Sequence, residues 1–184
     1  MPEYKRMVVT LLRHYKVLYT WKGRYTPEAF RRALRGYDEA DVIDQHEEVT
    51  GYQKVIISSL KRTFQTLQFI RPGDDYQRTP LLDEVPMGPF TDKRRSYSIH
   101  LLNVLGRLQW LLNSGKQPEN REESTQRART FIEEYLKEDH HYLIIGHGLF
   151  LRVLSYEMMK RGFRGKRILH FDNGRYFTYE WTRP

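Results

Sequence analysis

The chain has 184 residues, which fits one compact domain, and it contains no cysteine, which excludes disulfides and cysteine ligands to a metal. Its 31 lysines and arginines against 23 acidic residues give a formal charge of +8, which favours acidic partners, while a hydrophobic content of 39% argues against intrinsic disorder. A mean hydropathy of −0.72 and the lack of a signal-peptide pattern argue against a membrane or secreted protein, so we expect a cytoplasmic location.

The first part of the chain predicts two strands and two helices. The apolar run at 7–12, interrupted only by Thr10, is typical of a strand buried on both faces of a parallel sheet. Thr26 predicts the start of a helix, because its hydroxyl can cap the first turn, and Gly36 predicts the end of that helix. A second buried strand at 54–58 runs directly into a helical pattern that Pro72 ends.

Two further helices are predicted between residues 96 and 136. Four leucines spaced four, three and four residues apart form one apolar stripe and predict a helix over 96–113: Leu101, Leu105, Leu108 and Leu112. A polar surface connection is predicted at 116–123. Ser124 then predicts the cap of an amphipathic helix that carries Phe131 on its apolar face.

The last part of the chain predicts a strand, a glycine turn, a helix and a hairpin. The third buried strand is predicted at 142–145, and the glycine-histidine-glycine turn at 146–148 leads into a helix. Asn173–Gly174 is a two-residue hairpin signal, which predicts that strands at 168–171 and 175–181 pair with each other. The sheet is therefore expected to end with an antiparallel strand.

The alternation of strands and helices predicts an α/β fold, since parallel strands are usually joined by crossover helices. We expect a three-layer α/β/α sandwich with a mostly parallel central sheet, an antiparallel edge strand and a small helical cap insertion. Residues 1–184 would form a single domain, in which approximately 86–122 make up the cap. No repeat or linker divides the chain.

The residues that leave the predicted strands carry the chemistry, because ligands of open α/β sheets bind at the carboxyl ends of the strands. Arg13 and His14 follow the first strand, Arg62 lies in the first turn after the second, and His147 and Gly148 follow the third. Two arginines beside helix N-termini whose amides favour anions predict a phosphate site. A neutral histidine can attack phosphorus, and a nearby guanidinium disfavours its protonated form.

Four segments resemble the histidine phosphatases, also called the phosphoglycerate mutase-like superfamily. They are Leu-Leu-Arg-His at 11–14, Ser-Ser-Leu-Lys-Arg-Thr-Phe-Gln-Thr at 58–66, Leu-Leu-Asp-Glu at 81–84 and Ile-Gly-His-Gly at 145–148. Glutamate-serine at 123–124 is a weaker fifth segment. The order and spacing of the segments are similar to the family's pattern over most of the chain.

The resemblance implies a metal-independent phosphoric monoester hydrolase that forms a phosphohistidine. His14 would be the nucleophile, Glu84 the general acid and then the general base, and His147 a further catalytic residue. Asp83 precedes Glu84, and since successive side chains of extended backbone point in opposite directions, only one of the two is expected to face the site. The resemblance implies four phosphate-binding residues: Arg13, Arg62, His147 and Gly148.

The segment that follows the nucleophilic histidine departs from the family's pattern. Tyr15 follows the nucleophilic histidine where the family has glycine, so it could reshape the pocket or reduce activity. Lys16, Val17 and Thr20 also differ from the polar residues of the mutases. The alternatives to a phosphatase are therefore a catalytically weak or silent member that binds phosphorylated ligands, and a phosphotransferase or mutase.

The sequence indicates a phosphorylated small molecule as the partner and no cofactor. Five scattered histidines lack the acidic companions of a metal site and are interpreted as surface or core residues: His46, His100, His140, His141 and His170. Aromatic residues could stack on nucleic-acid bases, but several fall on apolar helix faces, where core packing explains them better: Phe30, Phe64, Phe131, Tyr135 and Phe150. No pattern in the sequence indicates an oligomeric state.

Overall fold

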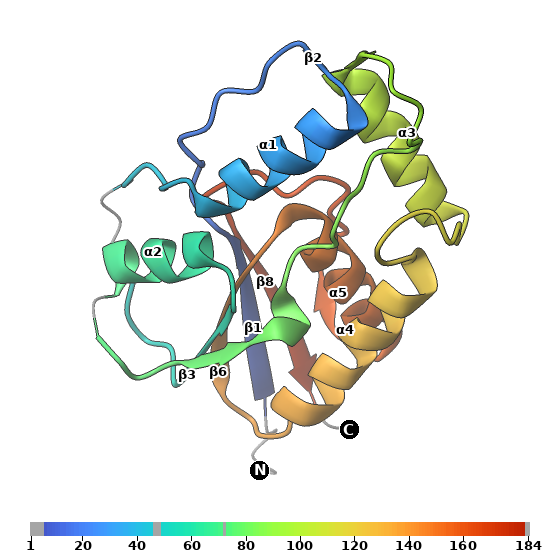
Figure 1. Cartoon of the computed structure of the whole chain (residues 1–184). Coiled ribbons are helices and arrows are strands. Elements are labelled where there is room, and N and C mark those ends of the chain that lie inside the picture. The colour runs from blue at the N-terminus through green and yellow to red at the C-terminus, as the bar shows by residue number, and fades with distance from the viewer. Residues whose placement is uncertain (1–5, 46–48, 72, 183–184) are drawn as a thin grey trace, which may run out of the picture.

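The computed structural model describes residues 6–45, 49–71 and 73–182, and this part of the chain contains a central sheet of six strands (Figure 1). Their bounds are β1 Arg6–Arg13, β3 Lys54–Ser58, β4 Gln77–Thr79, β6 His141–Gly146, β7 Arg164–Gly165 and β8 Tyr176–Thr182. The spatial order is β4-β3-β6-β1-β8-β7. The first four are parallel to one another, β8 is antiparallel to β1, and β7 is antiparallel to β8. The predicted mostly parallel sheet with an antiparallel edge is confirmed.

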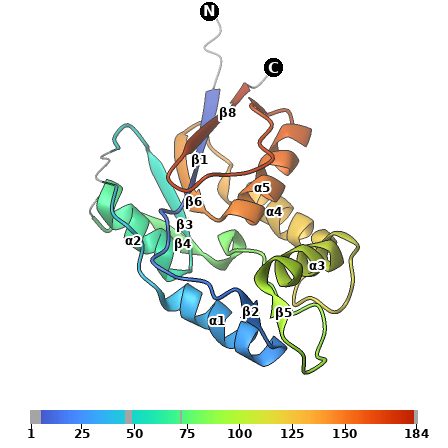
Figure 2. The same cartoon turned by 90° about the horizontal axis from the view of Figure 1, so that it is seen from above.

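Helices cover both faces of this sheet, as Figure 2 shows from above. The helices are α1 Pro27–Glu39, α2 Lys61–Ile70, α3 Ile99–Leu111, α4 Arg121–Tyr135 and α5 Gly148–Lys160, with a short 3₁₀ helix at Pro80–Leu82. α2 lies on one face, and α4 and α5 lie on the other, which is the expected three-layer arrangement. Helices α1 and α3 stand beyond the carboxyl ends of β1, β3 and β6.

The buried strands separate two hydrophobic clusters because their side chains alternate between the faces of the sheet. Met7, Val9 and Leu11 of β1 belong to the cluster under α4 and α5. Leu12 belongs to the opposite cluster, together with Leu67 of α2. Both clusters contain residues of β1 and β6, so these strands are buried between two packed layers.

A third cluster joins the cap to the start of the chain. Tyr25, Phe30, Ala33 and Leu102 are buried together, and the short strands β2 Arg24–Tyr25 and β5 Tyr97–Ser98 pair beside them. Helix α3 and strand β5, which lie in the segment that the sequence predicts to form a cap, therefore pack on the segment 24–39. No helix within the described residues is both long and apolar enough to span a membrane.

The start of α1 is confirmed and its predicted end is wrong. Thr26 caps the helix, and its Oγ1 accepts the amide of Ala29 at 3.3 Å. The helix continues through Gly36 to Glu39. A Cβ at Gly36 would lie 3.2 Å from the ring of Tyr19, so this glycine makes room for an aromatic contact within the helix. The predicted end at Pro72 lies outside the described residues.

Helix α3 is shorter than predicted, and its leucine stripe is largely exposed. Leu101, Leu108 and Leu112 are 40%, 44% and 69% exposed. The buried side of the helix is instead formed by Leu102, Gly106 and Trp110. A Cβ on Gly106 would come within 3.3 Å of the Gly88 carbonyl oxygen, because α3 packs on the 86–90 loop.

The predicted cap of α4 is also wrong. Asn120 is the N-cap, and Asn120 and Glu123 form a reciprocal capping box. Ser124 lies inside the helix and is fully buried. Its Oγ accepts the indole N–H of Trp110 at 2.9 Å, so Ser124 joins α4 to α3.

The predicted hairpin around Asn173–Gly174 is not formed. β8 pairs with Arg164–Gly165, and residues 168–171 are not a strand. Gly174 has a φ of +71°, and its amide donates to the Arg13 carbonyl at 3.0 Å. The Asn173 Nδ2 donates to the His14 carbonyl at 2.8 Å. The turn therefore fixes the backbone at the end of β1.

Candidate active site

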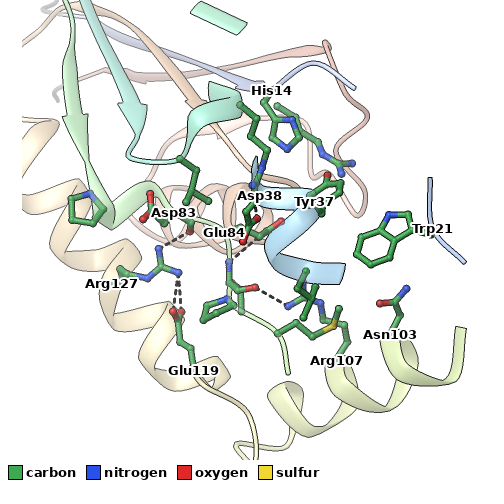
Figure 3. A pocket seen from close by; sticks show the side chains of 18 residues that line it. His14, Trp21, Tyr37, Asp38, Asp83, Glu84, Asn103, Arg107, Glu119 and Arg127 are labelled. Carbon is green, nitrogen blue, oxygen red and sulfur yellow. Dashed lines mark hydrogen bonds and ion pairs between the residues drawn. The ribbon is translucent and has the colours of Figure 1, made fainter. Parts of the chain in front are cut away.

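A cavity of about 670 Å³ opens between the carboxyl ends of the central strands and the cap (Figure 3). Four of the residues singled out from the sequence line this cavity: Arg13, His14, Arg62 and Glu84. His147 and Gly148 are not among the residues that line it, and the His147 side chain is fully buried. The residues that leave three separate strands are thus brought to one place, at the edge of the sheet where the sequence predicts a site.

His14 is held in one orientation at the end of β1. Its side chain is almost completely buried, and its Nδ1 lies 2.7 Å from the Tyr15 carbonyl oxygen. Because a carbonyl oxygen only accepts hydrogen bonds, Nδ1 carries the proton and Nε2 keeps its lone pair. Burial, followed by the charges of Arg62 and Arg13, lowers the pKa of His14 to about 3. At neutral pH the imidazole is therefore uncharged.

A chain of hydrogen bonds links Arg62, His147, Ser58 and Asp83. The Nε of Arg62 donates to His147 Nδ1 at 3.1 Å, so His147 carries its proton on Nε2, which lies 2.7 Å from Ser58 Oγ. Ser58 Oγ in turn donates to Asp83 Oδ1 at 2.9 Å. Complete burial and the Arg62 charge keep the pKa of His147 well below its usual value. Both ring nitrogens of His147 are engaged, and its ring centroid lies 5.1 Å from that of His14.

Arg62 is fixed by contacts on three sides. Its side chain is only 3% exposed, and Nη1 forms an ion pair with Asp38 of α1 at 2.7 Å. The guanidinium carbon lies 5.3 Å from the ring centre of Tyr37. Together with the bond to His147, these contacts orient the guanidinium beside the cavity, which is where an anion would gain most from a preorganised donor.

Arg13 reaches the cavity across the first turn of α5. Its Nη1 donates to the Phe171 carbonyl at 2.6 Å, while its Nε is buried without a hydrogen-bond partner among the described residues. A Cβ on Gly148 would lie 3.1 Å from the guanidinium carbon. Because Gly148 has no side chain, the Arg13 guanidinium can pack directly against its backbone.

Glu84 binds the amino end of α5. Its Oε1 accepts the amides of Val85 at 2.9 Å and Phe150 at 3.1 Å, and its Oε2 lies 3.4 Å from the amide of Leu149. The amides that the sequence reasoning assigned to an anion are therefore used by a carboxylate of the protein. This contact also places the Glu84 carboxylate in the wall of the cavity.

Asp83 lines the cavity as well, so the expectation that only one of the two acids faces the site is wrong. Its Oδ1 accepts the amide of Ser59 at 2.7 Å, and its Oδ2 accepts the Ser59 hydroxyl at 2.6 Å. The backbone leaves a 3₁₀ helix at this point, and strict alternation of side chains does not apply to such a turn. Both carboxylate oxygens of Asp83 thus accept hydrogen bonds from Ser58 or Ser59, whereas Glu84 stands nearer the middle of the cavity (Figure 3).

Several residues in the cavity wall were not predicted from the sequence. Arg127 of α4 donates to the Asp83 carbonyl at 2.7 Å and makes two bonds to Glu119 at 2.9 and 3.0 Å, so it holds the acidic loop in place. Asn103 and Arg107 enter from α3. The glutamate-serine segment is one turn from Arg127 and could have indicated it, but the leucine pattern of α3 gave no signal for Arg107.

Tyr15 does not fill the cavity, although it occupies the position of the family's glycine. Its side chain is fully buried in the cluster that contains Leu12 and Ile57. Its amide donates to Thr66 Oγ1 at 2.9 Å. The backbone therefore accepts a bulky residue here because the ring points into the core.

A metal site is not apparent in the part of the chain that the structure describes, where no three histidine, aspartate or glutamate side chains are close enough to hold an ion. His46, which was interpreted as an ordinary surface or core histidine, lies outside the described residues.

Comparison with known families identifies the class of protein. The model of the histidine phosphatase superfamily (branch 1) matches residues 11–184, and the chain therefore belongs to this superfamily. No curated protein sequence matches it. The resemblance seen in the four motifs is confirmed.

Solved structures share the fold at low sequence identity. The α-ribazole phosphatase from Shigella flexneri is 17% identical, with a TM-score of 0.57 over 94% of this chain and 89% of that chain. The phosphoserine phosphatase from Entamoeba histolytica, solved with 3-phosphoglyceric acid, is 14% identical, with a TM-score of 0.54 over 97% and 95%. The phosphoglycerate mutase from Bacillus anthracis is 12% identical, with a TM-score of 0.61 over 97% and 89%. The phosphoglycerate mutase-like α/β fold is thus established.

Proposed function

We propose that the protein is a metal-independent phosphatase that hydrolyses a phosphomonoester of a small molecule in the cytoplasm through a phosphohistidine. The main support is the state of His14, whose neutral ring keeps the Nε2 lone pair while Arg13 and Arg62 stand beside it. Two of the structural neighbours are phosphatases, which supports the hydrolysis of a phosphomonoester.

In the first step, Nε2 of His14 attacks phosphorus and the bond between phosphorus and the ester oxygen breaks. The leaving oxygen takes a proton from Glu84, which must enter this step in its acid form. The Tyr15 carbonyl, which accepts the His14 Nδ1 proton, stabilises the positive charge that develops on the ring. Arg13 and Arg62 donate to the phosphoryl oxygens as their charge spreads in the transition state.

In the second step, water attacks the phosphohistidine and gives its proton to Glu84. The bond between nitrogen and phosphorus breaks, inorganic phosphate leaves, and both His14 and Glu84 return to their starting states. In the resting structure Glu84 is bound to the α5 amides, so it must exchange at least one of these contacts to reach the ester oxygen or the water.

His147 and Gly148 serve the same phosphoryl group in this proposal. His147 fixes Arg62 through Nδ1, and its Nε2 proton would reach the ligand by leaving Ser58. Gly148 keeps open the position of the Arg13 guanidinium. The cluster therefore supplies donors from three strands to one anion.

Hydrolysis of an aryl phosphate in the presence of a chelator tests the proposal. Wild type should release phosphate and form an acid-labile, base-stable phosphoenzyme. His14→Gln should neither release phosphate nor form the phosphoenzyme. His100→Gln, which changes an exposed histidine of α3, is the matched control and should retain them. Full activity of His14→Gln, or no release by wild type, would reject the proposal.

A silent member that only binds phosphorylated ligands is the second candidate. The observation in its favour is that both Glu84 oxygens are engaged by the amino end of α5. Binding of vanadate without turnover of any phosphomonoester would favour this role. Transfer of the phosphoryl group to an added alcohol, in preference to water, would instead identify a phosphotransferase.

A further inference from the structure

The cavity is larger than a phosphoryl group requires. It extends from His14, past Glu84, to helix α3 on the opposite side, where Asn103 and Arg107 are placed (Figure 3). A phosphoryl group bound by Arg13 and Arg62 would occupy only the end next to His14. The remaining space is therefore available to the rest of the substrate, and the α3 end of the cavity determines what that part can be.

Arg107 forms no ion pair with the described residues of this wall. Its Nη1 donates to the Val85 carbonyl at 3.2 Å. Burial lowers the pKa of Arg107, because a partly buried guanidinium is less well hydrated than one in water. A guanidinium has five N–H donors, so a single carbonyl leaves most of them available to a ligand.

The two carboxylates whose charges act on Arg107 already have other partners. Glu84 accepts backbone amides at the start of α5, and Glu119 makes two bonds to Arg127. Both favour the charged form of Arg107 through space, yet neither is hydrogen-bonded to it. The anion that best completes this site would therefore come from outside the protein.

Asn103 lies one helical turn before Arg107, and residues four apart share a face of a helix. Both residues line the cavity, so α3 presents a carboxamide and a guanidinium to the same space. A planar oxyanion such as a carboxylate suits this pair, because a guanidinium can donate two parallel hydrogen bonds to it.

From this arrangement we infer that the substrate carries a carboxylate as a second anionic group, and that Arg107 binds it. The inference rests on the proposed function of the same cavity. His14 and Arg107 then mark the two ends of the substrate: the phosphoryl group binds at the carboxyl ends of the strands, and the second anion binds at the cap.

A series of ω-phosphonooxy alkanoic acids tests the inference, with their methyl esters and phenyl phosphate as probes that lack the second charge. Wild type should prefer an acid of one chain length to its ester. In Arg107→Gln, kcat/KM for that acid should fall by about 10-fold to 100-fold, mainly through KM, and the preference for the acid over its ester should disappear. Arg35→Gln, an exposed arginine of α1, controls for the loss of one positive charge and should keep the preference.

Each result bears on the role of Arg107 separately from catalysis. Equal losses for acid, ester and phenyl phosphate in Arg107→Gln would overturn the inference, since they would indicate that Arg107 only supports the Val85 loop. A wild type that does not distinguish acid from ester at any length would also overturn it. If no probe is hydrolysed, calorimetry measures the binding of the same acids and esters instead. Loss of the preference for the acid in Arg107→Gln would support the second anion site, and unchanged binding of the acid would refute it.

Discussion

Acidification from pH 7.5 to pH 5 is expected to destabilise the folded protein through His14. The lowered pKa of about 3 means that the folded state does not protonate this ring at pH 5, whereas the unfolded chain does so below about pH 6.5. The unfolded state therefore binds the extra proton, and the free energy of unfolding falls as the pH drops through this window. His147 acts in the same direction, because burial lowers its pKa as well.

The size of the effect follows from the two pKa values of His14. With values of about 6.5 unfolded and about 3 folded, proton linkage removes about 2 kcal/mol of stability between pH 7.5 and pH 5. The figure depends mainly on the unfolded value, because the folded ring is unprotonated at pH 5 for any folded pKa below about 4. The loss continues as the pH falls and ends near the folded pKa of about 3.

Urea unfolding at the two pH values, followed by tryptophan fluorescence, measures this loss. His14→Gln lacks the titrating ring, so its stability should fall by about 2 kcal/mol less than that of wild type over the same pH interval. His100→Gln, in which the replaced ring is exposed to solvent, should follow wild type. Equal pH dependence of wild type and His14→Gln would refute the burial of a neutral His14 and with it the proposed nucleophile.

Three further substitutions test particular contacts. Gly148→Ala places a methyl group 3.1 Å from the Arg13 guanidinium and should lower kcat/KM for an aryl phosphate by about 10-fold to 100-fold with little change in Tm; unchanged kinetics would contradict that packing. Asn120→Ala should reduce stability to urea by about 1 kcal/mol through loss of the capping box, and no loss would argue against it. Ser124→Ala should cost about 1 to 3 kcal/mol, because the Trp110 indole N–H loses its acceptor, and adding Trp110→Phe should recover part of that cost.

The buried strands could be predicted from the sequence because their signal is local. Each of 7–12, 54–58 and 142–145 contains a short run of adjacent apolar residues, which is typical of a strand in a parallel sheet covered on both faces. The residues just after these runs converge for the same topological reason. His14 and Arg62 could therefore be selected before their distances were known.

The errors arose where the role of a residue depends on distant contacts. The leucines of α3 repeat at helical spacing, but that helix covers a cavity and packs through Gly106 and Trp110. Ser124 has the chemistry of a cap, yet its hydroxyl is used by Trp110. Asn173–Gly174 has the composition of a hairpin and is instead bound to the end of β1. Composition alone does not show which of several hydrogen-bond partners a side chain will meet.

The contact between this turn and β1 also sets the order in which the site can be assembled during synthesis. Arg13 and His14 leave the ribosome early, whereas the residues that hold their carbonyl groups, Asn173 and Gly174, follow about 160 residues later. A growing chain therefore carries every proposed catalytic side chain before it has a completed pocket. Proteolytic loss of the segment from Asn173 onward should likewise inactivate the protein, although it removes none of those side chains.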